Sequence, residues 1–231
     1  MPVFEDPSMG HATEQDARGD AGAVKLAWRG RIVGVQPRIR LTRSYDERSH
    51  SYLGYALRLD GELAGASRLF GVGIGKAAQA KQAFRVGDVV SGLGVPVADP
   101  RLEAVDLYRT SRLKLLERGP ATTSEGPPWT GVPPTLAEYR ERGHRRLDAR
   151  TYEAKCTACQ WGCRMAVELI IDQWNPSRRR HRFETFCYGP KSCPSYRAGP
   201  TRKAQGRKSY MVHEEADWVD EDETRHRGPD D

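Results

Sequence analysis

Residues 29–43, RGRIVGVQPRIRLTR, and residues 51–62, SYLGYALRLDGE, decide the fold of the first half of the chain. Both stretches alternate apolar and polar residues with the two-residue period of a strand that has one buried face. A polar turn, residues 44–51, separates them, so the pattern predicts a β-hairpin. The side chains expected to face inward are Ile39, Leu41, Leu53, Tyr55, Leu57 and Leu59. Pro37 interrupts the first stretch and indicates a bend or a sheet edge.

The following segments predict one helix and further strands. Residues 75–84, GKAAQAKQAF, are rich in helix formers, and residues 85–97, RVGDVVSGLGVPV, form a β-branched run with glycines at both ends. Residues 102–118 have apolar residues at strand spacing, although a helix is an alternative there. We therefore expect about five strands, with a short helix before the fourth.

This order of elements, together with FRVGDVV at residues 84–90, resembles an OB-fold, a five-stranded Greek-key barrel, over residues 24–118. The resemblance implies oligonucleotide binding on the face of the second and third strands. By the alternation described above, the outward candidates on that face are Arg38, Arg40, Tyr52 and Arg58. Barrels of this type also serve as protein-contact modules, so a protein partner is the alternative.

All five cysteines fall between Cys156 and Cys193. An odd number in a chain of this length favours metal binding over a secreted disulfide framework. A C-x2-C turn, as at residues 156–159, brings two thiolates to one tetrahedral ion such as Zn²⁺. Residues 164–175 and 181–186 read as two strands of a hairpin that returns the later cysteines to this turn, so residues 152–196 resemble a zinc ribbon. The expected ligands are Cys156, Cys159, Cys187 and Cys193, with Cys163 as the alternative ligand.

Two features of the cysteine pattern keep other sites open. The second pair is spaced C-x5-C instead of C-x2-C, and Cys156, Cys159, Cys163 and Cys187 would suffice for an iron–sulfur cluster. A histidine could also supply a fourth ligand, the candidates being His144, His181 and His213. A hairpin module of about 45 residues has little apolar area to bury, so we expect the metal to stabilise it directly.

Basic and aromatic residues are interleaved around this module. In the hairpin, Trp174 and Phe186 are expected to form a small core, whereas Trp161 and Tyr188 are the candidates for stacking on unpaired bases. A flexible basic arm follows at residues 197–213. The candidates for phosphate contacts are Arg178, Arg179, Arg180, Arg182, Arg202, Lys203, Arg207 and Lys208.

Charge along the chain favours a polyanionic partner. Residues 1–23 carry one basic and five acidic side chains, and residues 214–231 carry two and nine. Between these acidic ends, residues 24–150 carry 22 basic and 13 acidic side chains, and residues 151–213 carry 12 and four. A surface of one sign attracts nucleic acid through counterion release. The acidic end at residues 214–231 is either a solvated tail or an internal competitor for the basic surface.

The whole chain is therefore expected to be mainly β: a five-stranded OB-like Greek-key barrel plus a small metal-stabilised β-hairpin module, with disordered acidic termini. The expected segments are 1–23, a disordered acidic N-terminus; 24–118, the barrel; 119–134, a Pro/Gly linker; 135–151, a short helix; 152–196, the cysteine module; 197–213, the basic arm; and 214–231, the acidic tail. Neither a membrane span nor an export signal is found, which favours a cytoplasmic protein. No motif singles out an active site, so a nucleic-acid-binding protein with structural zinc is favoured over an enzyme.

Overall fold

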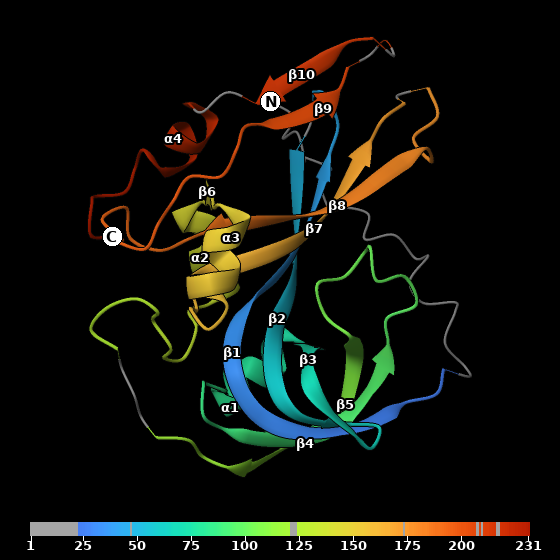
Figure 1. Cartoon of the computed structure of the whole chain (residues 1–231), viewed down its shortest axis with the longest axis vertical. Coiled ribbons are helices and arrows are strands. Elements are labelled where there is room, and N and C mark those ends of the chain that lie inside the picture. Colours follow the sequence, from blue (N-terminus) through green and yellow to red (C-terminus); the bar gives the residue numbers. More distant parts are fainter. Residues whose placement is uncertain are drawn as a thin grey trace, which may run out of the picture.

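The computed structural model of the protein describes residues 23–46, 48–120, 124–172, 174–206, 208, 210–215 and 218–231. Of the expected N-terminal segment, residues 1–23, all but the last residue lie outside this part of the chain. Strands dominate the fold, as expected for a mainly β protein (Figure 1). Among the described residues, no helix combines the length and the apolar character needed to cross a membrane.

The first half of the chain forms five strands around one core. The elements are β1 (Leu26–Arg43), β2 (Arg48–Leu63), β3 (Ala66–Ile74), α1 (Lys76–Gln82), β4 (Val89–Pro96) and β5 (Leu107–Glu117). Their pairings close a ring, because β1 pairs with both β2 and β4, while β5 pairs with both β3 and β4. The expected order of five strands with a helix before the fourth is confirmed, and residues 107–117 form a strand instead of the alternative helix.

Alternation along the strands fills the centre of this ring. Leu57 and Leu59 of β2 are fully buried, as the sequence predicts, whereas Leu53 near the start of the strand is only partly buried. They pack with Ile32, Phe70 and Val72 from the neighbouring strands. Helix α1 directs the buried Gln79 toward the carbonyl of Phe84, to which its side-chain amide donates at 3.0 Å.

Strand β1 is long enough to belong to two parts of the sheet. Residues 26–31 pair with β4, and residues 40–43 pair in parallel with residues 166–169 of the second half. Between these stretches β1 pairs with β2 alone, and this part contains Pro37 and a register shift between Arg38 and Ile39. The bend expected at Pro37 therefore lies where β1 passes from the barrel to the second half of the molecule.

The second half extends the same sheet instead of forming a separate one. It contains α2 (Leu136–Arg142), β6 (Arg145–Arg146), α3 (Ala149–Thr151), a π-helical turn η2 (Tyr152–Cys156), β7 (Gly162–Ile170) and β8 (Arg179–Cys187). The expected hairpin is confirmed as β7 and β8, and β7 joins β1. Its inner residues, including Met165 and Val167, share one core with the barrel. The hairpin therefore has a larger apolar contact than its own residues would provide.

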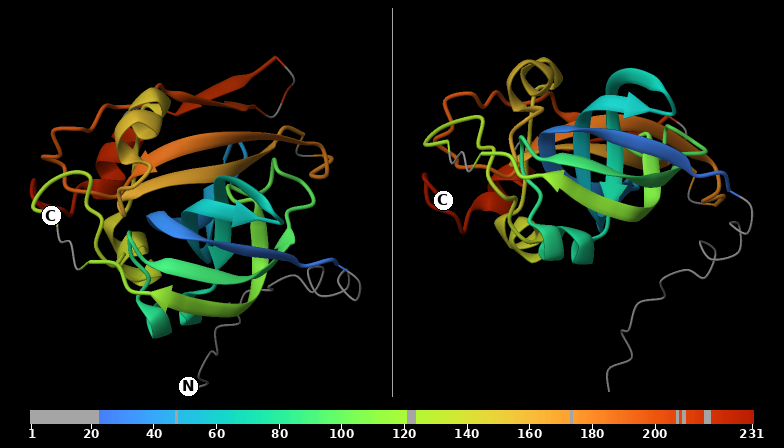
Figure 2. Two further views of the ribbon diagram at one scale, coloured as in Figure 1. Left: turned by 60° about the horizontal axis from the view of Figure 1, so that its bottom comes forward. Right: turned by 90° about the horizontal axis from the view of Figure 1, so that it is seen from below.

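The C-terminal region is more ordered than the sequence suggests. Strands β9 (Arg202–Gln205) and β10 (Val212–Glu215) form a second, two-stranded sheet, and α4 (Trp218–Thr224) lies against β6. These elements lie on the side of the hairpin, away from α1 (Figure 2). The flexible arm expected at residues 197–213 is wrong where β9 and β10 form, and the disorder expected at residues 214–231 is wrong for α4. Ion pairs with arginines of the barrel explain this order, as described below.

Candidate metal centre and nucleic-acid surface

Four of the five cysteines meet at the base of the β7–β8 hairpin. Cys156 ends the π-helical turn, Cys159 follows it, Cys187 ends β8 and Cys193 lies in the next loop. Each of these four thiols lies close enough to the other three for their charges to interact. The pairing of Gly162 with Cys187 in the hairpin brings the two ends together. The chain thus gathers the four residues that the spacing predicts as ligands.

Backbone hydrogen bonds shape the turns that carry these sulfurs. The N–H of Cys159 donates to the carbonyl of Cys156 at 3.1 Å, which closes the C-x2-C turn. The N–H of Gly189 donates to the sulfur of Cys187 at 3.4 Å. The sulfur of Cys159 accepts backbone N–H groups from Trp161 and Trp129. Such N–H donors favour the charged form of a sulfur, which is the form that binds metal.

Burial opposes that charge when no cation is present. Burial, together with the neighbouring thiols, raises the pKa of Cys156 to about 12 and that of Cys159 to about 11. Burial also raises the pKa of Cys187. No disulfide links the described cysteines, so all five are free. As placed here, no group of three or more His, Cys, Asp or Glu side chains among the described residues is arranged to hold a metal ion.

The fifth cysteine lies apart from the other four. Cys163 is fully buried in the barrel core, and its thiol donates to the carbonyl of Pro37 at 3.3 Å. Burial alone raises its pKa, with no contribution from another cysteine. Cys156, Cys159 and Cys187 belong instead to a second cluster with Leu147. The alternative ligand set containing Cys163 therefore has less geometric support than the set without it.

The three histidines considered as ligands contact other groups. His144 is buried beside Glu223, with 3.2 Å between its Nδ1 and the carboxylate. His181 lies 3.7 Å from Glu168, and the ring of His213 stacks near Tyr45. None of these described contacts is to a cysteine.

A buried glutamine of the barrel holds the cysteine turn. The side-chain amide of Gln36 donates to the carbonyls of Cys156 at 2.8 Å and Cys159 at 2.9 Å. Its oxygen accepts the hydroxyl of Tyr152 at 2.7 Å. Sequence reasoning missed this residue. The available signal is a polar side chain between Val35 and Pro37, in a stretch that the strand pattern otherwise buries.

The barrel residues proposed for nucleic-acid binding differ in whether other residues of the protein already contact them. Arg38 and Arg40 both pair with one carboxylate, that of Glu103, at 2.7 and 2.8 Å. The ring of Tyr52 is covered by the guanidinium of Arg140, 4.7 Å from its centre. Arg58 is partly exposed and forms no ion pair with any described residue. Of the three arginines, Arg58 is therefore the one whose charge no described carboxylate balances.

The tip of the β7–β8 hairpin carries an exposed aromatic ring among exposed arginines. Trp174 is 79% exposed, so its expected place in a hairpin core is wrong, whereas Phe186 is buried as expected. The tryptophan lies in the loop beyond the last paired residues of β7 and β8. Arg178 in the same loop and Arg180 near the start of β8 are exposed, and Arg178 reaches Asp172 only at 3.9 Å. Arg179 pairs with Glu168 at 2.5 Å.

The two aromatic residues expected to stack on bases are covered. Tyr188 is fully buried between the rings of Tyr139 and His144, so it cannot stack on a base and its expected role is wrong. Trp161 is partly buried, and the guanidinium of Arg142 lies 4.4 Å from its ring centre. The stacking candidate is therefore Trp174, which the sequence reasoning assigned to the interior.

Several of the remaining basic candidates pair with acidic residues. Glu184, whose side chain is fully buried, lies 2.5 Å from Arg182, 3.2 Å from Arg202 and 3.7 Å from Arg43. Lys203 reaches Glu214 at 3.8 Å. Lys208 is exposed beside the ring of Tyr210, and Arg207 lies outside the described residues.

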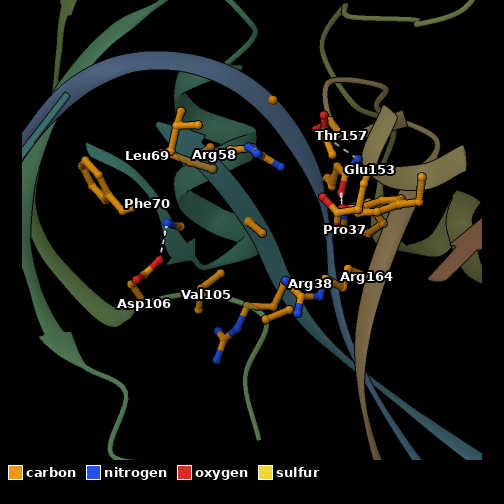
Figure 3. A pocket seen from close by; sticks show the side chains of 17 residues that line it. Pro37, Arg38, Arg58, Leu69, Phe70, Val105, Asp106, Glu153, Thr157 and Arg164 are labelled. Carbon is orange, nitrogen blue, oxygen red and sulfur yellow. Dashed lines mark hydrogen bonds between the residues drawn. The ribbon is translucent and has the colours of Figure 1, made fainter. Parts of the chain in front are cut away.

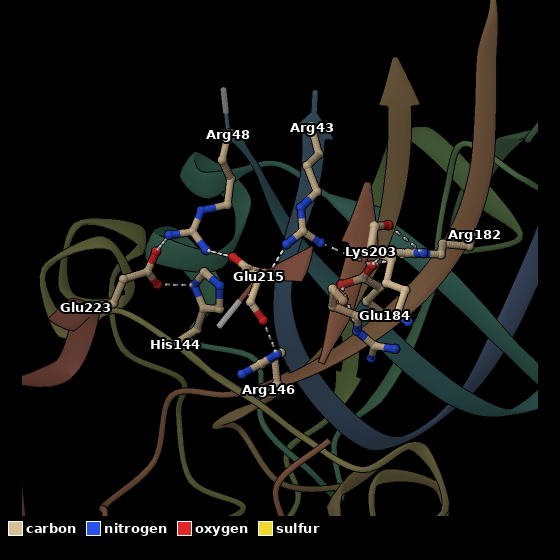
Figure 4. Close-up of polar contacts among 10 residues, drawn as sticks. Arg43, Arg48, His144, Arg146, Arg182, Glu184, Lys203, Glu215 and Glu223 are labelled. Carbon is tan, nitrogen blue, oxygen red and sulfur yellow. Dashed lines mark hydrogen bonds and ion pairs between the residues drawn. The ribbon is translucent and has the colours of Figure 1, made fainter. Parts of the chain in front are cut away.

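The acidic C-terminal region folds back onto basic residues of the barrel. Glu215 pairs with Arg43 and Arg48, and Glu223 pairs with Arg48 (Figure 4). Of the two interpretations of residues 214–231, a solvated tail does not account for these three ion pairs. Burial lowers the pKa of Arg43 to about 10, opposed by Glu184, so this arginine stays charged at neutral pH. The carboxylates therefore neutralise cations that the fold has placed away from water.

Comparison of the chain with protein-family models, with curated proteins and with solved structures found no match. The assignment of a function therefore depends on the contacts described above. Three features carry the assignment. They are the four neighbouring thiols, the exposed Trp174 at the arginine-rich hairpin tip, and Arg58 of the barrel, which forms no ion pair with a described residue.

Proposed function

We propose that this protein binds single-stranded nucleic acid and that one zinc ion stabilises its second half. The observation that carries the binding proposal is the hairpin tip, where Trp174 is 79% exposed and Arg178 and Arg180 are exposed near it. Burying an exposed indole in a complex gains apolar contact, and every base offers a face for stacking. Arginines beside it would hold the neighbouring phosphates. The combination is typical of sequence-tolerant binding to unpaired strands.

The connectivity of the barrel supports the second element of the proposal, an OB-type barrel at residues 24–118. Strand β1 pairs with both β2 and β4, and β3 pairs in parallel with β5, so the ring closes in the order β1–β2–β3–β5–β4. In barrels of this type the face of the second and third strands binds oligonucleotides. Arg58 of β2 lies on that outer face and is our candidate contact there.

Four sulfurs from both ends of one hairpin support the choice of zinc. A set of four cysteines with a C-x2-C turn is a common structural zinc site, and thiolates are ligands that Zn²⁺ prefers. The set is Cys156, Cys159, Cys187 and Cys193, whose thiols already lie within electrostatic range of one another. An iron–sulfur cluster is the alternative, and Cys163, a member of the set that would suffice for it, donates to the carbonyl of Pro37 in β1 instead.

Elemental analysis and absorption spectroscopy of anaerobically purified protein test the metal. We expect a colourless protein with one zinc per chain. A brown protein with iron and acid-labile sulfide would replace zinc by a cluster, and a protein with neither metal would reject both assignments.

Fluorescence anisotropy with labelled single-stranded RNA and DNA tests binding. Affinity should fall steeply as salt rises, since each neutralised phosphate adds roughly 0.7 to the logarithmic slope for single strands. Replacing Trp174 by alanine should weaken binding about 10-fold, because a stacked base contributes roughly 1–3 kcal/mol. The double variant Arg178→Gln/Arg180→Gln should lower the salt slope by about one or more.

A matched control removes two charges elsewhere. Lys76 and Lys81 are exposed on α1, which lies on the opposite side of the molecule from the hairpin tip (Figure 1). The variant Lys76→Gln/Lys81→Gln should bind almost as the wild type does. Equal losses in both double variants would mean that net charge alone attracts the strand. No binding of either nucleic acid at low salt would reject the proposal and favour a protein partner for the barrel.

A further inference from the structure

A cavity lies where the outer face of the barrel meets the turn that carries the first cysteines (Figure 3). Its volume is about 240 Å³. Three parts of the chain line it: strands β1 to β3, the loop at residues 104–106, and the segment between Tyr152 and Arg164. Among the lining residues on the barrel side, Gly34, Ala56 and Gly71 are small. The short side chain of Ala56 leaves room in the cavity, whereas the glycines let Thr157 and Val105 approach the strands.

The wall opposite the barrel is held in place by the cysteine turn. A Cβ atom at Gly34 would lie 2.6 Å from the carbonyl oxygen of Thr157, so glycine there allows the turn to approach β1. Tyr152 is fixed by its hydrogen bond to Gln36, which also holds the carbonyl of Cys156. Part of this wall is the π-helical turn Tyr152–Cys156, a rare conformation that is frequent at functional sites. The cavity is therefore built jointly by the two halves of the molecule.

Two guanidinium groups in this cavity have no carboxylate partner among the described residues. They belong to Arg58 of β2 and Arg164 of β7, and both lie near enough to Tyr152 to influence its hydroxyl. Arg164 stacks on Phe183, with 4.2 Å between the guanidinium carbon and the ring centre. Arg38 also lines the cavity, but both of its hydrogen bonds go to Glu103. Arg58 and Arg164 can therefore hold an anion from opposite halves of the molecule.

The other lining groups add apolar surface and a hydrogen-bond acceptor. Leu69 of β3 is 53% exposed, which is unusual for so large an apolar side chain beside a cavity. Glu153 is exposed and forms no ion pair with the described residues. Asp106, in contrast, already accepts from the N–H of Gly71 at 2.7 Å and from Arg68 at 3.0 Å. The available chemistry thus comprises two cations, one apolar contact and one carboxylate.

We propose that this cavity holds a single nucleotide, with the phosphate between Arg58 and Arg164, the base against Leu69, and Glu153 accepting from the hydroxyl or amino groups. The volume of about 240 Å³ is below the range of roughly 300–1,000 Å³ found for ligand pockets. The cavity is therefore too small for more than one monomer. The choice of a nucleotide as the ligand rests on the proposed nucleic-acid function. The nucleotide in the cavity is either a free monomer or one residue of a bound strand.

Calorimetric titration of the full-length, zinc-loaded protein separates these sources. The probes are adenosine and uridine 5′-monophosphates, inorganic phosphate, and a 12-nucleotide single strand. The variants Arg58→Gln and Arg164→Gln each remove one guanidinium, and Ala56→Leu fills the barrel side of the cavity. Arg112→Gln removes an exposed arginine of β5 that does not line the cavity and serves as the matched control.

We expect the monophosphates to bind the wild type and Arg112→Gln alike, and to bind the three cavity variants at least about 10-fold more weakly, because a hydrogen bond to a charged group contributes roughly 1.5–3 kcal/mol. Unchanged thermal unfolding of Ala56→Leu shows that this loss is not a loss of fold. Binding of the 12-mer without any cavity dependence, or phosphate binding as strongly as the nucleotides, overturns the inference and leaves the proposed function standing. Monophosphate binding that depends on the cavity while the 12-mer fails to bind supports the inference with a free nucleotide as ligand and rejects the proposed function.

Discussion

The side-chain amide of Gln36 donates to the carbonyl of Cys156 at 2.8 Å across 120 positions of sequence. The same amide reaches the carbonyl of Cys159, and its oxygen accepts from the hydroxyl of Tyr152. All of these groups are buried, so leaving any of them unpaired costs free energy. One side chain of the barrel therefore fixes the turn that carries two of the four clustered sulfurs.

Replacing Gln36 by leucine should lower the free energy of unfolding by about 3 kcal/mol, because two buried carbonyls each lose one of their donors and one buried hydroxyl loses its acceptor. Urea unfolding of the purified protein measures this change. The milder variant Tyr152→Phe removes only one of the three hydrogen bonds and should cost about 1 kcal/mol. If Gln36→Leu costs no more than Tyr152→Phe, the carbonyl contacts do not contribute to stability.

The cysteines can be separated by single substitutions. Cys156→Ser should abolish stoichiometric zinc binding and lower stability by more than about 3 kcal/mol, since loss of a metal is among the largest single-residue effects. Cys163→Ala should retain one zinc per chain and cost only about 1–2 kcal/mol, as expected for a small group removed from a packed core. Zinc content and thermal unfolding give both results. Loss of zinc in Cys163→Ala would move the site to the alternative ligand set.

The sequence predicts those parts of the fold that depend on neighbours along the chain. Alternation buries Leu57 and Leu59, and at the start of the expected short helix the Thr135 hydroxyl accepts the N–H of Glu138 at 3.2 Å. The C-x2-C spacing likewise brings Cys156 and Cys159 together. Each of these signals is complete within a few residues.

Contacts between distant segments left no such signal. The parallel pairing of Arg40 with Ala166 joins the hairpin to the barrel, but no local pattern specifies which strand edge β7 will join. Trp174 and Phe186 are both aromatic residues in a hairpin, and only the register of β7 and β8 shows that Trp174 lies beyond the paired region. The role of Gln36 also depends on where the cysteine turn packs. These features are tertiary contacts, and no periodic pattern in the sequence indicates them.

The buried carboxylate of Glu184 should be one of the most sensitive positions in the molecule. It lies among Arg43, Arg182 and Arg202, and its side chain is fully buried. Glu184→Gln should destabilise the protein by roughly 3–5 kcal/mol, because it leaves buried cations without their counter-charge. The exposed pair of Asp222 with Arg225 gives the control, and Asp222→Asn should cost less than about 1 kcal/mol. Chemical unfolding that gave equal values for the two variants would contradict a structural role for the buried network.

Acidification below neutral pH should destabilise the fold through the histidine pair His50 and His144, whose ring centres lie 4.9 Å apart. Burial, followed by the charges of Arg48 and Arg43, lowers the pKa of His50 to about 4, and burial with the same neighbours lowers the pKa of His144 well below its ordinary value. For His144 the charge of His50 adds to these causes, and Glu223 of α4, which also pairs with Arg48, lies 3.2 Å from its Nδ1. Both imidazoles are therefore neutral in the folded protein at neutral pH.

Between pH 6.5 and about 4 the unfolded chain takes up a proton at His50 that the folded protein does not, so stability must fall as the pH falls through this window. The expected contribution of His50 at pH 5 is roughly 1–2 kcal/mol. Urea midpoints at pH 7 and pH 5 measure the loss for the wild type and for His50→Gln, which cannot titrate. Carboxylates and thiols affect both proteins equally, so the difference between the two losses isolates the histidine. Identical losses would show that His50 is protonated as readily in the folded protein as in the unfolded chain.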